Sequence, residues 1–245
     1  MTVPRAVEAS IADGPLAPSV GEGRGFGPPT LSFAVTGAGA EPFAAAPTLR
    51  FDLVVTSEPG VRIRSLLLNT QIRIDAARRS YATEEQVRLV ELFGTAERWG
   101  ETLRGFLWTH ATSAVPPFEE MTTVKLLVPC TYDFDVAASK YLSGLANGDV
   151  PLELLFSGSV FYDDAAGRLQ TARLSWESEA RYRMPVAVWK DMIDHYFPDS
   201  SWLRLRRDAF ERLYAFKADR ALTSWDDAVT LLLDAAGRPV AERSR

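Results

Sequence analysis

The sequence is poor in the residues that build covalent cross-links and metal sites. It contains one cysteine, Cys130, and two histidines, His110 and His195, among 245 residues. A single cysteine excludes an intrachain disulfide and favours a reducing compartment, so we predict a cytoplasmic protein. A zinc site on both histidines would need carboxylate or cysteine partners, and Cys130 is expected to face the core. We therefore predict no metal and no cofactor.

Excess positive charge and long apolar runs are also missing. With 27 basic and 32 acidic residues the net charge is −5, which argues against a general nucleic-acid binder. No apolar run approaches the roughly 18 residues of a transmembrane helix, and no secretory signal is predicted at the N-terminus. Hydrophobic residues make up 47% of the chain, as expected of a globular protein with a sizeable core.

The common catalytic motifs are absent as well. The sequence has no G-x-S-x-G elbow, no H-E-x-x-H and no phosphate-binding GK[ST]. Cys130 lies between Val128 and Tyr132 on the apolar side of a predicted strand, which favours an inert thiol over a nucleophile with His110 as base. His195 falls near the C-terminus of a predicted helix, where the helix dipole favours it. We predict no catalytic residue and a protein that is not an enzyme.

The most regular part of the chain is residues 151–198. Residues 171–184 alternate between apolar and polar side chains, which predicts a strand with one buried and one wetted face. Residues 163–167 (DDAAG) supply a turn that would pair this strand with 152–162. A helix follows from Pro185 to Pro198, and Trp176 and Trp189 are expected in the core.

Similar patterns predict the other elements. Strands are expected at 31–35, 49–55, 61–74 and 124–134, with an edge strand inside 95–118 that ends at Pro116-Pro117. Helices are expected at 83–94, 136–147 and 206–220, with a last one from Ser224 to Gly237. Thr83 to Gln86 would form a capping box at the first of these helices.

These elements define the fold class and the domains. We predict an α+β protein with an antiparallel β-sandwich-like core of six or seven strands, inserted short helices and a helical C-terminal third. A single antiparallel sheet backed by the helices is the alternative. Residues 1–29, rich in proline and glycine, would form a flexible leader. The sandwich domain would span 30–198, the helices of 199–236 would pack on it, and 237–245 would be a polar tail.

Charged side chains suggest two kinds of binding. Loop aspartates can bind calcium, and Asp133, Asp135, Asp163 and Asp164 lie at predicted strand ends and turns, although solvated turn residues are the simpler and preferred explanation. The wetted face of residues 171–184 carries alternating charges, which predicts a ladder of salt bridges or a docking surface. Tryptophans in irregular segments would add interface anchors. The residues predicted to bind a partner are Trp99, Trp202, Arg173, Glu177, Glu179 and Arg181.

Four segments together resemble a known bacterial family of unknown function whose genes often stand beside those of nickel–iron hydrogenases. They are VPCTYDF (128–134), LLFSGSVFY (154–162), MPVAVW (184–189) and HYFPDSSWLRLRRDAF (195–210). The resemblance covers about residues 30–236 and includes no catalytic motif. It implies an accessory or assembly role in hydrogenase biogenesis, with a hydrogenase subunit or a maturation factor as partner.

Three hypotheses follow for the function. The first is a non-enzymatic accessory or interaction protein that assists assembly of a nickel–iron hydrogenase. The second is a β-sandwich module that binds a small ligand or calcium. The third is an enzyme with an unrecognised site centred on His110 or His195. We favour the first because the chain lacks a catalytic constellation, contains six tryptophans and shows the family resemblance.

Overall fold

A computed structural model describes residues 28–130, 136–198, 200 and 204–237. Within these ranges the chain forms nine strands, six α-helices and two short 3-10 helices. The strands pair in antiparallel fashion in two sheets. The predicted α+β class with an antiparallel sandwich core is confirmed. The predicted leader (1–29) and polar tail (237–245) lie almost entirely outside the described residues.

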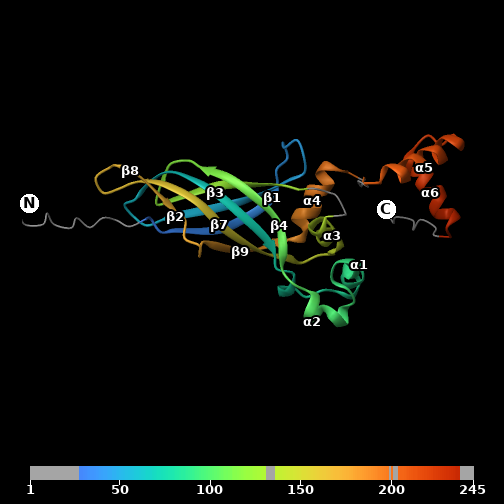
Figure 1. Cartoon of the computed structure of the whole chain (residues 1–245), viewed down its shortest axis with the longest axis horizontal. Coiled ribbons are helices and arrows are strands. Elements are labelled where there is room, and N and C mark those ends of the chain that lie inside the picture. Colours follow the sequence, from blue (N-terminus) through green and yellow to red (C-terminus); the bar gives the residue numbers. More distant parts are fainter. Residues whose placement is uncertain (1–27, 131–135, 199, 201–203, 238–245) are drawn as a thin grey trace, which may run out of the picture.

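The two sheets face each other (Figure 1). Sheet A has the strand order β1–β2–β6, formed by β1 (Leu31–Ala40), β2 (Thr48–Ser57) and β6 (Met121–Pro129). Sheet B has the order β4–β3–β7, and β8 and β9 both pair with the far edge of β7. Its strands are β3 (Arg62–Ile74), β4 (Phe106–Val115), β5 (Phe118–Glu119, paired with β3), β7 (Asp149–Asp163), β8 (Leu169–Arg173) and β9 (Glu179–Pro185). Since β1 lies beside β9 and β4 beside β6, the sandwich is nearly closed along both sides.

Alternating side chains fill the space between the sheets. On β2 and β3 the inward residues have no exposed surface: Leu49, Phe51, Leu53, Val55, Ile63, Leu66, Leu68, Ile72 and Ile74. A period of two directs one side of each strand into the core and the other into solvent. In β3 this period is interrupted once, by a register shift between Ile63 and Ser65. β4 is an edge strand of sheet B and ends at Val115, immediately before the two prolines, as predicted.

The predicted strand 171–184 is divided in two. β8 and β9 both pair with β7, with Arg173 opposite Ser159 and Glu179 opposite Leu155. The five residues 174–178 therefore face the three residues 156–158 and form a bulge. Because the surplus is two residues, side chains before and after the bulge keep the same faces. The predicted hairpin with 152–162 is correct, and the division, together with the two-residue β5, explains why nine strands replace six or seven.

The position of Trp176 was predicted wrongly. It lies in this bulge and is 88% exposed, whereas Trp189 is buried as expected at 2%. In a regular strand Trp176 would share the inner face with Ala172 and Ala180, but the bulge releases residues 174–178 from the pleat.

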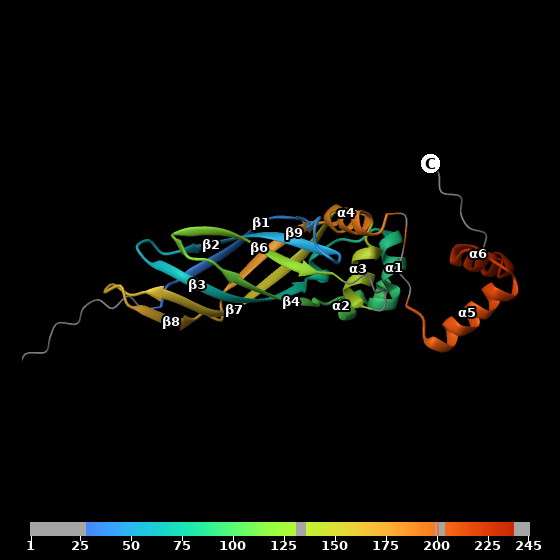
Figure 2. The same cartoon turned by 90° about the horizontal axis from the view of Figure 1, so that it is seen from above.

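Four helices gather at one end of the sandwich (Figures 1 and 2). They are α1 (Thr83–Phe93), α2 (Trp99–Thr102), α3 (Ala137–Gly144) and α4 (Val186–Tyr196), with 3-10 turns η1 (Ala76–Arg78) and η2 (Ala96–Arg98). α4 buries Val186, Trp189, Met192 and Ile193. Its last residue, Tyr196, donates from Oη to the carbonyl oxygens of Glu41 (2.5 Å) and Ala44 (3.2 Å), which holds α4 to the β1–β2 loop.

The capping box at α1 differs from the prediction. The N-cap is Ala82 rather than Thr83, and Glu85 rather than Gln86 accepts from the backbone amide of the N-cap residue, at 3.1 Å. Alanine has no side-chain oxygen to complete the box. Glu85 is also only 2% exposed, because it is held by a buried arginine described below.

The C-terminal helices form a hairpin of their own. α5 (Arg207–Asp219) and α6 (Trp225–Ala235) contact each other, and in both views they lie apart from the sheets (Figures 1 and 2). The predicted cap at Ser224 is confirmed, since its Oγ accepts from the amide of Asp227 at 3.0 Å. No described residue of α5 or α6 belongs to the sandwich core, and the packing of 199–236 on that domain stays a prediction. Among the described helices none is long and apolar enough to cross a membrane.

Candidate interaction site on the outer face of sheet B

The outer face of sheet B carries the cross-strand ladder of charged side chains expected from the sequence. Arg73 on β3, Glu153 on β7 and Arg181 on β9 lie opposite one another in the register. Glu153 lies 4.0 Å from each of the two guanidinium groups. Arg181 also pairs with Glu179 at 3.4 Å. Nearer the helical end of the sheet, Arg183 pairs with Asp149 at 3.5 Å. Such exposed pairs contribute at most about 1 kcal/mol each to stability.

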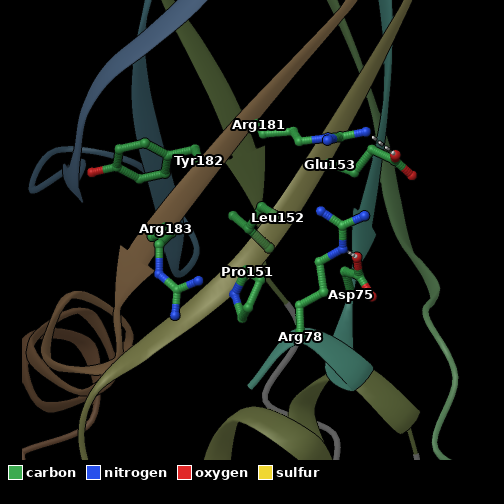
Figure 3. A pocket seen from close by; sticks show the side chains of 8 residues that line it. All are labelled: Asp75, Arg78, Pro151, Leu152, Glu153, Arg181, Tyr182 and Arg183. Carbon is green, nitrogen blue, oxygen red and sulfur yellow. Dashed lines mark ion pairs between the residues drawn. The ribbon is translucent and has the colours of Figure 1, made fainter. Parts of the chain in front are cut away.

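A hollow of about 250 Å³ opens in this face beside the ladder (Figure 3). It is lined by Asp75, Arg78, Pro151, Leu152, Glu153, Arg181, Tyr182 and Arg183. Three guanidinium groups thus stand against two carboxylates in its walls. Each arginine keeps most of its side chain exposed, between 58% and 61%.

Each arginine of the hollow lies within ion-pair distance of a carboxylate. Nε of Arg78 lies 2.9 Å from Asp75, whereas Arg183 lies 3.5 Å from Asp149. Since the three arginine side chains are 58–61% exposed, their guanidinium groups can be reached from solvent. Planar guanidinium groups bind carboxylates and phosphates through paired N–H donors. The hollow can therefore accept an anionic group.

Trp176 is the exposed aromatic residue on the same edge of the sheet. It is 88% exposed in the β8–β9 bulge, on the strand line that carries Arg173 and Arg181. The sequence contains a hint of this position, since Ser175, Glu177 and Ser178 are poor strand formers that surround the tryptophan. We call Arg173, Trp176, Glu179, Arg181 and Arg183 together the β9 edge strip.

The structure distributes the predicted partner-binding residues unevenly. Arg173, Glu177, Glu179 and Arg181 are all exposed along β8, the bulge and β9, and Glu179 and Arg181 are in contact. Trp99 is partly buried in an aromatic cluster: its ring meets Tyr81 at 5.1 Å and its Nε1 donates to the carbonyl of Gly94 at 3.0 Å. Trp202 lies outside the described residues. Partner binding by these side chains stays a prediction.

A buried ion pair, missed by sequence reasoning, lies next to the start of β7. The side chains of Arg79 and Glu85 are 6% and 3% exposed, and their charged groups meet at 2.6 Å. Arg79 also donates to the carbonyl oxygens of Asn147 (2.8 Å) and Asp149 (3.0 Å). It thereby fixes the start of β7, from which Pro151 and Leu152 extend into the hollow.

The environment of Glu85 favours its charged form. Burial raises the pKa of the carboxyl group, but three donors outweigh it: the Ala146 amide at 2.7 Å, the Arg79 guanidinium and the Ala82 amide. The net pKa of Glu85 lies below its ordinary value. Hydrogen bonds to a carboxylate stabilise the ionised form, so Glu85 is a structural anion.

The two histidines lie on the surface of different elements. His110 is exposed on β4, opposite Gln71. His195 lies with Nε2 3.3 Å from the carbonyl oxygen of Pro42, and its ring meets that of Tyr196 edge-on. Each is accounted for by its place on the surface of a strand or helix, and neither adjoins the hollow.

The described turn aspartates are already engaged. Asp163 accepts from Nε of Arg64 with both oxygens, at 2.8 and 3.0 Å. Asp164 closes the β7–β8 turn, and the Arg168 amide that donates to it is the main reason its pKa falls to about 2. Asp133 and Asp135 lie outside the described residues. Within the described ranges no group of three His, Cys, Asp or Glu side chains is arranged to hold a metal ion.

Cys130 is expected to be unreactive in the native protein. It is 7% exposed, and burial raises the pKa of its thiol to about 12. Since the thiolate is the reactive species, iodoacetamide near neutral pH should label native Cys130 far more slowly than the unfolded chain. Mass spectrometry with and without urea measures the two rates, and equal rates would contradict the buried position.

The described architecture is that of an antiparallel β-sandwich with a helical end, a charged outer face and a separate helical hairpin. A model of a family of unknown function, DUF6084, matches residues 28–241, so the chain belongs to this family. No curated protein matches the sequence. Nothing in these comparisons links the family to hydrogenase genes.

Solved structures give only distant similarities. The β-glucosidase of Kluyveromyces marxianus is 10% identical over 64% of this chain and 15% of its own, with a TM-score of 0.22. The β-glucosidase 3B of Thermotoga neapolitana in complex with α-D-glucose is 13% identical over 63% of this chain and 17% of its own, with a TM-score of 0.23. The chain thus spans less than a fifth of these enzymes, and TM-scores this low carry no argument.

Proposed function

We propose that this protein is a non-enzymatic interaction protein that binds a partner protein along the β9 edge strip. The observation that carries the proposal is the position of Trp176, which is 88% exposed on the same strand line as Arg173, Arg181 and Arg183. Exposed tryptophan and arginine are the residues that most often dominate binding energy at protein interfaces. Burying so large an aromatic surface favours association, while arginines set orientation and specificity.

The chemistry of the strip suggests the kind of partner. Its arginines, with the hollow beside Arg78, fit a protein surface that presents Asp or Glu side chains. Trp176 requires an apolar recess at some distance along the same surface. Since exposed guanidinium–carboxylate contacts are screened by salt, binding should weaken as ionic strength rises. A cytoplasmic hydrogenase subunit or maturation factor is our proposal for this partner, on the basis of the family resemblance alone.

Affinity capture from the native host tests the proposal. The tagged full chain should enrich a specific partner, and Trp176→Ala combined with Arg181→Glu should lower its recovery at least about tenfold, as expected for loss of two interface anchors. Arg62→Glu and Leu169→Ala serve as matched controls, since they change an exposed arginine and an exposed apolar residue outside the strip. All variants should keep the wild-type melting temperature, because every altered side chain is exposed.

Two outcomes would count against the proposal. If the double variant captures the same partners at wild-type yield, the strip is not the interface. If specific partners include neither a hydrogenase subunit nor a maturation factor, the hydrogenase assignment fails while the interaction role stands.

A further inference from the structure

The α5–α6 hairpin exposes more apolar surface than a stable pair of helices can leave in water. Of its described residues only Ala228 is buried. The large apolar side chains that remain 38–59% exposed in and beside it are Leu205, Phe210, Tyr214, Trp225, Val229, Leu231, Leu232 and Leu233. Units below roughly 40 residues rarely form a sufficient core alone, and short helices depend on tertiary packing. Something must therefore cover this hairpin.

Both helices contribute to the exposed apolar surface. Phe210 and Tyr214 of α5 meet Trp225 of α6 at ring distances of 5.4 and 6.2 Å, so aromatic packing joins the two. On α6, positions 225, 228, 229 and 232 follow a helical period and form one apolar stripe. Leu231 and Leu233 widen this stripe on both sides. α5 covers only one flank of it, as the burial of Ala228 alone indicates.

The charges of the hairpin are divided between its two halves. Residues 204–220 contain six basic and three acidic side chains, and residues 221–237 contain three acidic and no basic ones. The α5 half is thus positive by three charges and the α6 half negative by three. Arg207 and Arg212 on α5, and Asp226 and Asp234 on α6, form no ion pair with any described residue. These four charges are available to a partner.

We infer that the hairpin is the dimerisation element of this protein, covered by the hairpin of a second copy in a four-helix bundle. A two-fold axis places the α5 of one copy against the α6 of the other, twice. Each contact then joins a positive half to a negative half, while the apolar stripes meet at the centre. The hairpin lies apart from the sandwich of its own chain (Figure 2).

Reciprocal charge reversal tests this arrangement on the full chain. Arg207→Glu with Arg212→Glu makes both halves of the hairpin negative, and Asp226→Arg with Asp234→Arg makes both halves positive. In sedimentation velocity the wild type should have about twice the 27.1 kDa of one chain, and each double variant alone should approach the mass of one chain. An equimolar mixture of the two variants should restore the dimer, because both contacts are then complementary.

An apolar variant supplies an independent measure. Leu232→Glu should raise the dissociation constant on the order of 100-fold, since the contact is lost in both copies, and mixing with either charge variant should not rescue it. Trp176→Ala with Arg181→Glu should leave the dimer intact, which separates this inference from the proposed partner site. A monomeric wild type, dimers of both charge variants alone, or a mixture that stays monomeric would each overturn the inference.

Discussion

Replacement of Arg79 by methionine should lower the free energy of unfolding by about 3–5 kcal/mol, the usual cost of leaving one member of a buried ion pair behind. The side chains of Arg79 and Glu85 are almost completely buried, and their charged groups meet at 2.6 Å. Methionine fills similar space but cannot neutralise Glu85 or donate to the carbonyl oxygens of Asn147 and Asp149. Urea denaturation monitored by tryptophan fluorescence measures the loss.

Arg62→Met is the matched control. Arg62 pairs with Glu119 at 3.6 Å, but the two side chains are 54% and 70% exposed. Exposed pairs contribute at most about 1 kcal/mol, so this variant should be nearly as stable as the wild type. Equal losses in the two variants would show that burial of Arg79 and Glu85 does not matter.

The pH dependence of the Arg79→Met variant gives a second, more specific result. In the folded wild type the pKa of Glu85 lies below that of an ordinary glutamate. Its ionised carboxylate therefore stabilises the fold at a pH above the ordinary pKa, and this stabilisation is lost as the pH falls through the pKa of the folded state. Without Arg79, burial raises the pKa of Glu85. As the pH falls, protonation of Glu85 then removes the unpaired buried charge that destabilises the variant. The stability gap between wild type and variant should therefore narrow from about pH 7 to about pH 4. A constant gap would mean that the variant loses packing rather than charge pairing.

Gly158→Ala should destabilise the protein by about 3 kcal/mol or more, because a side chain would meet both backbone strain and overpacking. Gly158 has φ of +152° and lies opposite Leu68 in the β3–β7 pair. A Cβ atom there would stand 1.9 Å from the carbonyl oxygen of Leu67. The carbonyl of Gly158 also accepts from the amide of Leu174 at the start of the bulge. Thermal or urea unfolding measures the effect.

Gly167→Ala separates the two causes. Gly167 in the β7–β8 turn also has positive φ, at +75°, but nothing lies within 4 Å of a Cβ atom at this position. Alanine at this position should lower the free energy of unfolding by only about 1 kcal/mol, the strain of an L-residue with positive φ. If the two alanine variants lose the same stability, the close approach of β7 to β3 at Gly158 is not a constraint.

Period-two alternation predicted the sandwich core correctly. Each inward side chain of β2 falls on the expected phase, because the pleat assigns alternate residues to opposite faces whatever the rest of the chain does. In β3 the apolar residues occupy both phases, and a register shift between Ile63 and Ser65 allows Ile63 and Leu66 both to be buried. Pairing of β7 with the following strands was predictable for a similar reason, since a short polar turn leaves few other partners. The cap at Ser224 and the edge strand that ends at Val115 likewise depend on residues close in sequence.

The features that the sequence did not predict depend on long-range contacts. Arg79 meets Glu85 and the backbone of residues 147–149, some seventy positions further along the chain, and no local pattern marks an arginine that will be buried. Glu85 consequently takes the capping role that its neighbour Gln86 was expected to have.

The bulge that exposes Trp176 also results from contacts between segments distant in the chain. It lies where β7 approaches β3 too closely for any side chain at Gly158, and only the pairing of the strands reveals that approach. Alternation alone therefore predicted that Trp176 is buried. In the tertiary structure it lies on the surface, on the same strand line as the arginines. The sequence by itself specifies which residues can be buried. Which charged residue is buried, and which tryptophan is not, depends on contacts between segments distant in the chain.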